Sequence, residues 1–213
     1  MRIAIIGATG KQGNLIVQEA LKQGCDVTAV VRNKNKITDS RVKVLEKSIF
    51  DLAYDDIKNY EVIVDAFGTW SDESQELHQT SLKHLTDILS GKSKRLLVVG
   101  GAGSLYVDPQ KTVRLLDTPE FPDSFKPVAS NMGKAFDALS ERTDVNWTYL
   151  SPAADFNFEG KRTGSYKLGQ DNLILNAAGE SYVSYADYAI ALVDEIKNKA
   201  FLGKRFTVVS EKQ

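Results

Sequence analysis

The chain has 213 residues, of which 42% are hydrophobic and 26% are charged, and its formal net charge at pH 7 is −1. This length suits one globular domain, and we expect a single domain over residues 1–213. The balanced charge lacks the basic excess typical of general nucleic-acid or membrane-surface binding, so we expect neither partner.

Cysteine use and the first residues bear on the compartment. The single cysteine, Cys25, cannot form an internal disulfide, which fits a reducing compartment. An apolar run follows directly after Met1 and Arg2, which is not the layout of a signal peptide. No apolar run has the length of a membrane span. We therefore expect a cytoplasmic protein, and the oligomeric state stays open.

Short apolar runs alternate with amphipathic stretches along the chain. Runs that are apolar throughout are typical of parallel strands buried on both faces. Their alternation with helices indicates an α/β fold with a doubly wound parallel sheet. Strands are predicted at 3–6, 27–31, 42–45, 62–64, 96–99, 147–150 and 205–209, and helices between 15 and Gly24 and around 52–58, 73–90, 130–141 and 185–198.

Two long segments interrupt this alternation. Residues 101–128 contain most of the prolines, and residues 154–183 are similarly irregular. Long irregular segments after the carboxyl end of a strand are usually functional loops. We expect both segments on the substrate side of the sheet.

The stretch GATGKQG, residues 7–13, lies between the first strand and the first helix. Glycines allow a tight turn and a close backbone approach, and the helix N-terminus offers free N–H groups, so the stretch predicts a dinucleotide pyrophosphate site. A P-loop would need glycine at Ile5 and Ser or Thr at Gln12, and a simple tight turn is the remaining alternative. The predicted contacts are Gly7, Thr9, Gly10, Lys11, Gln12 and Gly13.

The end of the second strand bears on the choice of dinucleotide. An NAD site usually has an acidic residue there to bind the ribose 2′-hydroxyl, but this sequence reads Val30-Val31-Arg32-Asn33. The planar guanidinium of Arg32 suits a 2′-phosphate. We therefore predict NADP(H) in preference to NAD(H), with a solvated surface role of Arg32 as the alternative.

Two further stretches follow predicted strands and are candidate cofactor contacts. Asp51 follows the third strand, where it could meet the adenine or serve as the N-cap of the next helix. Ala66, Phe67 and Gly68 follow the fourth strand, where a backbone with small residues can run close to a ribose.

These stretches together resemble the short-chain dehydrogenase/reductase superfamily, and more narrowly its atypical branch of NmrA-like proteins, biliverdin-IXβ/flavin reductases and bacterial NADH-flavin reductase-like proteins. The resemblance implies a Rossmann fold that binds NAD(P), cofactor contacts at Ser151, Pro152 and Ala153, and a flavin or quinone as substrate. It is carried by Gly7-Ala8-Thr9-Gly10-x-x-Gly13, Val30-Val31-Arg32, Ala66-Phe67-Gly68, residues 98–104 (VVGGAGS), Ser151-Pro152-Ala153 and residues 183–189 (VSYADYA).

The chain departs from the superfamily at its Tyr-x-x-x-Lys motif. Lys134 stands where the lysine belongs, but Ser130 stands in place of the tyrosine. Because a serine hydroxyl is a far poorer acid than a tyrosine hydroxyl, alcohol dehydrogenation and sugar-nucleotide epimerisation are not expected.

Reduction of a flavin or quinone needs little acid catalysis, because the nicotinamide carries the hydride and the protein supplies binding and orientation. Ser104 could bind the substrate or the nicotinamide amide, or be a capping serine. Lys134 could anchor the nicotinamide ribose, or be an exposed helix lysine. Trp70 could stack on a planar substrate, or be a core or lid aromatic. With no Cys/His cluster in the sequence, no metal is expected.

The sequence thus supports two functions. The first is an NADPH-dependent reductase of a small planar acceptor. The second is a non-catalytic NADP(H)-binding sensor of the NmrA type, in which the cofactor biases contact with a partner protein.

Overall fold

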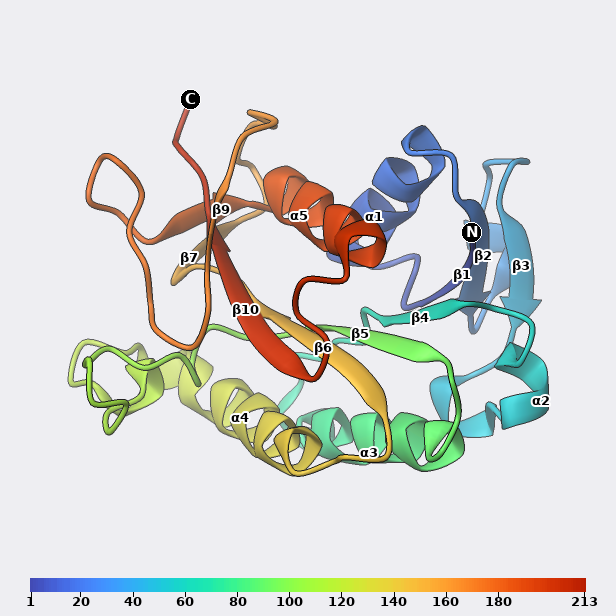
Figure 1. Ribbon diagram of the computed structural model, residues 1–213, viewed down its shortest axis with the longest axis horizontal. Helices are drawn as coiled ribbons and strands as arrows, with labels where there is room; N and C mark the ends of the chain where they lie inside the picture. The colour runs from blue at the N-terminus through green and yellow to red at the C-terminus, as the bar shows by residue number, and fades with distance from the viewer.

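The computed structural model describes the backbone of residues 1–213 and all side chains except that of Asp72. Its centre is a mostly parallel sheet with the strand order β3-β2-β1-β4-β5-β6-β10-β8 (Figure 1). The strands are β1 (Arg2–Ile6), β2 (Asp26–Val31), β3 (Lys43–Glu46), β4 (Val62–Asp65), β5 (Arg95–Val99), β6 (Asn146–Ser151), β8 (Lys167–Gly169) and β10 (Lys204–Val209).

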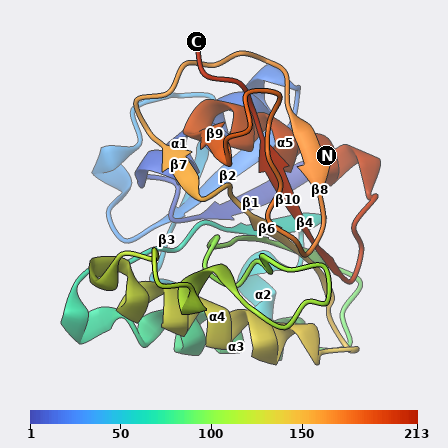
Figure 2. The same ribbon diagram turned by 90° about the vertical axis from the view of Figure 1, so that its left-hand side faces the viewer.

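Helices cover both faces of this sheet. Helices α1 (Lys11–Lys22) and α5 (Tyr185–Asn198) pack together on one face, and α3 (Leu77–Leu89) and α4 (Lys126–Ser140) pack on the other (Figures 1 and 2). Each helix pair closes its own apolar core against the sheet. None of the helices in the described chain has the length and apolar character needed to cross a membrane.

The doubly wound fold and its seven parallel strands are confirmed, and the structure differs from the prediction in several places. The strand β8 runs antiparallel to β10 at the edge of the sheet. Helix α4 begins at Lys126, because Pro127 is compatible with a first helical turn. The segment 154–183 contains β7 (Asp155–Asn157) and β9 (Tyr182–Ser184), which pair in a separate small sheet.

The helix predicted around 52–58 is much shorter than expected. It consists of α2 (Tyr54–Ile57), preceded by the 3₁₀ turn η2 (Ile49–Asp51). The proposed N-cap role of Asp51 is wrong, because Ala53 is the N-cap of α2 and its N–H donates to Asp56 Oδ2 at 2.8 Å. A single helical turn is too short to show a helical period in the sequence.

The strand order reverses between β1 and β4. From β1 the sheet continues through β2 and β3 to one side, and from β4 it continues through β5 and β6 to the other. Ile6 is in register with Asp65, and Asp65 is in register with Val98, so these strands end at a common edge. Ligands of open α/β sheets bind at such a switch point, beyond the carboxyl ends of the strands. The turns after β1 and β4 therefore define where a site belongs.

The opposite edge of the sheet contains a buried ion pair. Arg95 of β5 pairs with Glu195 of α5, and their side chains are 6% and 3% exposed. Arg95 also donates to the Oγ1 of Thr148 at 3.0 Å. Removal of one partner of such a pair typically costs about 3–5 kcal/mol, because the remaining charge is buried alone. The pair therefore fixes the end of α5 on the sheet.

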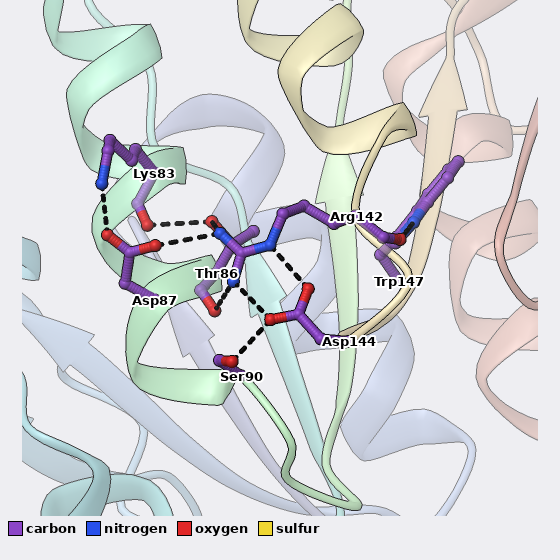
Figure 3. Close-up of polar contacts among 7 residues, drawn as sticks. All are labelled: Lys83, Thr86, Asp87, Ser90, Arg142, Asp144 and Trp147. Atoms are coloured by element: carbon purple, nitrogen blue, oxygen red, sulfur yellow. Dashed lines mark hydrogen bonds and ion pairs between the residues drawn. The ribbon is translucent and has the colours of Figure 1, made fainter.

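Arg142 joins the end of α3 to the segment before β6 (Figure 3). Its guanidinium donates to Asp87 at 2.9 Å, to Asp144 at 2.7 Å and to the carbonyl of Thr86 at 3.1 Å. Hydrogen bonds from Lys83 and then Arg142 lower the pKa of Asp87, and hydrogen bonds from Arg142 and then Ser90 lower the pKa of Asp144. Because the cluster lies where β6 begins, far from the switch point, its role is to hold α3 in place.

Candidate functional site

The turn after β1 packs against the turn after β4 through backbone alone. Gly7 has a φ of +73°, and a Cβ at this residue would lie 2.4 Å from the carbonyl oxygen of Ala66. A Cβ at Gly13 would lie 2.2 Å from the carbonyl oxygen of Gly7. The N–H of Gly10 donates to that same carbonyl at 2.9 Å. Glycine is therefore required at both positions by space, and at Gly7 also by its left-handed conformation.

The N-terminus of α1 opens directly from this turn. Gly10 is its N-cap without a side-chain cap, and its first turn contains no acidic residue. The N–H groups of the first helical residues have no partner within the helix, and the positive end of the helix dipole adds to them. This arrangement suits a phosphate group.

The side chains at the start of α1 also fit a bound dinucleotide. Gln12 is buried, and its Nε2 donates to the carbonyl of Tyr185 at 3.2 Å. Its Oε1 is buried and has no hydrogen-bond partner within the described chain. Such an atom is costly unless a donor reaches it, and a cofactor hydroxyl is a suitable donor. The Nζ of Lys11 lies 4.3 Å from the centre of the Phe158 ring, and Thr9 is exposed.

Arg32 is exposed just after β2. Two nearby cations have acidic partners. The backbone N–H of Lys34 donates to Glu46 at 3.0 Å and its Nζ is 3.7 Å from the same carboxyl, while Arg41 pairs with Asp39 at 2.6 Å. Among the side chains that the structure describes, no ion pair joins Arg32 to an acid. Its guanidinium is thus available to an anion.

The candidate adenine region is built by η2 and the turn after β4. The rings of Phe50 and Phe67 meet edge to face, with centroids 6.5 Å apart. This contact brings exposed Asp51 near Ala66 and exposed Gly68. The adenine contact of Asp51 stays a prediction.

A buried carboxyl lies beneath this turn. Asp65 accepts a hydrogen bond from the N–H of Phe67 at 3.0 Å, and burial raises the pKa of Asp65 to about 6. Together with His78, Ser81 and Tyr149 it lines a small internal cavity. Sequence analysis missed Asp65, although a carboxylate that ends a continuous apolar strand beside the glycine turn is itself a signal.

The two predicted catalytic residues lie on different sides of α4. Ser104 is only 3% exposed, and Arg205 donates to its Oγ at 3.1 Å and to its carbonyl at 2.9 Å. Arg205 in turn donates to Asp171 at 3.1 Å. Lys134 is exposed, whereas its neighbour Gly133 faces Ser104. No contact described for the chain joins Ser104 to Lys134, and their catalytic roles stay predictions.

The remaining predicted contacts differ in exposure. Ser151, Pro152 and Ala153 are buried at the end of β6, and the Oγ of Ser151 has no partner within the described chain. Trp70 is 69% exposed, so its interpretation as a core aromatic is wrong. Its ring meets that of Phe125, which sequence analysis missed because no periodic pattern marks the segment 101–128.

Comparison with known proteins agrees with this geometry. A family model described as NAD(P)H-binding matches residues 7–199. The uncharacterized protein YwnB of Bacillus subtilis (strain 168) is 52% identical over 212 residues, which cover 99% of each chain.

Two crystal structures are also similar to this chain. One, a candidate NADH-flavin reductase from Streptococcus pneumoniae TIGR4, is 42% identical with a TM-score of 0.95, covering 99% of this chain and 100% of that one. The other, a candidate epimerase from Bacteroides thetaiotaomicron, is 33% identical with a TM-score of 0.86, covering 100% and 99%.

Substitution of Gly7 tests whether the backbone contact with Ala66 builds the site. Gly7→Ala must displace the turn, so we expect at least a tenfold loss of NADPH affinity in calorimetric titration. Gly24→Ala is the matched control, because Gly24 has a similar φ of +78° but open space around its Cβ position. It should lose about 1–2 kcal/mol of stability from the left-handed conformation and keep its affinity. Equal affinities in the two variants would contradict the packing argument.

Asp65 should make stability fall as the pH rises. Its folded pKa of about 6 exceeds the ordinary 3.8, so the stabilising effect of its proton is complete below pH 3.8 and is lost as the pH passes 6. At about 1.4 kcal/mol per pKa unit, the loss is about 3 kcal/mol. Asp65→Asn cannot titrate, and part of the loss has already occurred at pH 4, so its free energy of unfolding in urea should fall by about 2.4 kcal/mol less between pH 4 and pH 8 than that of the wild type. Asp55→Asn changes a side chain that is 84% exposed, so its free energy of unfolding should vary with pH as that of the wild type does. If the free energy of unfolding of Asp65→Asn falls as much as that of the wild type, the raised pKa of Asp65 is refuted.

Proposed function

The chain belongs to the NAD(P)H-binding family, and we propose that it is a cytoplasmic reductase that passes hydride from NADPH to a small planar acceptor, a flavin or a quinone. The observation that carries the proposal is the N-terminus of α1, which opens at the switch point from a turn that only glycine can form. NADPH, when bound, supplies the hydride.

Each part of the site has a proposed role toward this cofactor. The first turn of α1 binds the pyrophosphate, and Ala66 to Gly68 line the adenosine ribose. The unpaired Oε1 of Gln12 accepts a hydrogen bond from a cofactor hydroxyl. Lys134 and Ser104 are the proposed contacts of the nicotinamide side, and residues 151–153 border it with their backbone.

Arg32 is the proposed determinant of cofactor choice. An exposed guanidinium without an ion pair in the described chain suits the doubly charged 2′-phosphate of NADPH. The Streptococcus pneumoniae relative is described with NADH, so the preference for NADPH rests on Arg32 alone. The same relative supports a flavin as acceptor.

The alternative function is an NADP(H)-binding sensor. It is favoured by Ser130, which stands in place of the catalytic tyrosine, and by the exposure of Lys134. In that case the protein binds NADPH, and the cofactor stays reduced in the presence of every acceptor.

Turnover distinguishes the two functions. We expect the purified protein to accelerate the loss of nicotinamide absorbance when NADPH is mixed with FMN, FAD or a small quinone. The reaction then contains the protein site, the hydride donor and an acceptor. Reactions without protein and with NADH run in parallel. Tight NADPH binding without oxidation by any acceptor would reject the reductase in favour of the sensor.

Arg32→Ala tests the preference for NADPH. A lost charge-assisted contact is worth about 1.5–3 kcal/mol, so NADPH affinity should fall about 10- to 100-fold in fluorescence titration while NADH affinity changes less than threefold. Arg41→Ala is the control, because Arg41 is exposed but already bound to Asp39. If Arg32→Ala weakens both nucleotides equally, the assignment is wrong.

A further inference from the structure

Two exposed aromatic side chains meet at the carboxyl edge of the sheet. Trp70 is 69% exposed and Phe125 is 49% exposed, and their ring centroids are 6.3 Å apart with an interplanar angle of 71°. Large aromatic side chains bury most of their surface in ordinary folds. A contiguous exposed pair of this kind marks a surface that something apolar covers.

The two rings come from segments that adjoin the cofactor site. Trp70 lies two residues beyond Gly68, in the turn that follows β4. Phe125 is the N-cap of α4 and lies at the end of the segment between β5 and that helix. Figure 2 shows this segment in green above α4. The contact between the rings therefore joins the turn after β4 to the segment 101–128.

The backbone that carries Trp70 is held from below by His78 of α3. The Nε2 of His78 donates to the carbonyl of Thr69 at 3.0 Å, and its ring meets the Phe67 ring edge to face at 5.8 Å. Burial lowers the pKa of His78, which keeps the ring neutral at neutral pH. The indole is thus presented from a supported backbone.

Edge-to-face contact leaves aromatic faces uncovered, and such faces favour offset stacking with another planar ring. We propose that Trp70 and Phe125 form an aromatic platform, in which the three-ring system of a flavin stacks on the exposed indole of Trp70 and the Phe125 ring holds that indole by its edge-to-face contact. The proposal rests on the proposed reductase function and names its acceptor. The platform consists of carbon surfaces, so it recognises the flavin ring and not its phosphate tail. A single-ring quinone covers less of it.

Direct binding tests the platform without turnover. Protein saturated with NADP⁺ is titrated into lumiflavin, riboflavin and FMN, and flavin emission, which stacking on tryptophan quenches, is recorded. Stacking on an aromatic side chain is worth about 1–3 kcal/mol, so Trp70→Leu should raise the Kd of all three flavins about tenfold or more. Phe125→Leu should raise it severalfold.

Two controls accompany the titration. Leu202→Ala changes a side chain that is also 49% exposed but lies between α5 and β10, at the opposite edge of the sheet, and it should bind flavin as the wild type does. Unchanged NADPH affinity in both platform variants shows that they are folded and that the cofactor site is intact.

The outcomes separate the platform from the proposed function. Flavin binding that both platform substitutions weaken supports the platform even if no NADPH is oxidised, a result that would reject the reductase alone. Flavin reduction with a KM that Trp70→Leu leaves unchanged would keep the reductase and overturn the platform. FMN binding ten times tighter than lumiflavin binding would also overturn the platform, because the phosphate tail would then account for recognition. The absence of flavin binding in the wild type would overturn it as well.

Discussion

The arrangement of the site depends on one steric constraint, the contact between the turn after β1 and the turn after β4. The missing side chain of Gly7 lets the carbonyl of Ala66 approach, and the missing side chain of Gly13 lets α1 start against the carbonyl of Gly7. Any larger residue would push the helix away from the switch point. The contact thus places the positive end of α1 and the turn after β4 around one space.

The turn after β4 is held from beneath by two buried polar groups on either side of Gly68. Asp65 accepts from the N–H of Phe67, and His78 donates to the carbonyl of Thr69. Burial disfavours the charged form of the Asp65 carboxyl, which is the physical cause of its raised pKa. One short turn therefore connects the cofactor side of the site to the aromatic platform, and it takes its shape from α3 and β4 together.

The parts of the fold that the sequence predicts are those with a local pattern. Continuous apolar runs indicated the parallel strands, and the spacing of Gly7, Gly10 and Gly13 indicated the turn. The three-residue strands β7, β8 and β9 are too short for a period of two to stand out. The buried contact between Arg205 and Ser104 joins residues that are 101 positions apart in the sequence. Phe125 becomes a candidate site residue only through its ring contact with Trp70. Such pairings are fixed by tertiary packing, which no single stretch of sequence contains.

Ser130 occupies the position at which the resemblance to the superfamily expects a tyrosine, which bears on the direction of the proposed chemistry. Tyr149 lies near the carboxyl edge, but its hydroxyl accepts from the N–H of Gly101, and burial raises the pKa of Tyr149 to about 12. It therefore keeps its proton at neutral pH and is not a phenolate base for an alcohol. The hydroxyl of Ser104 accepts from Arg205, which only donates, so Ser104 keeps its own hydrogen to donate. These groups fit the proposed acceptor, a flavin that receives a hydride and a hydrogen bond, better than they fit an alcohol that must lose a proton.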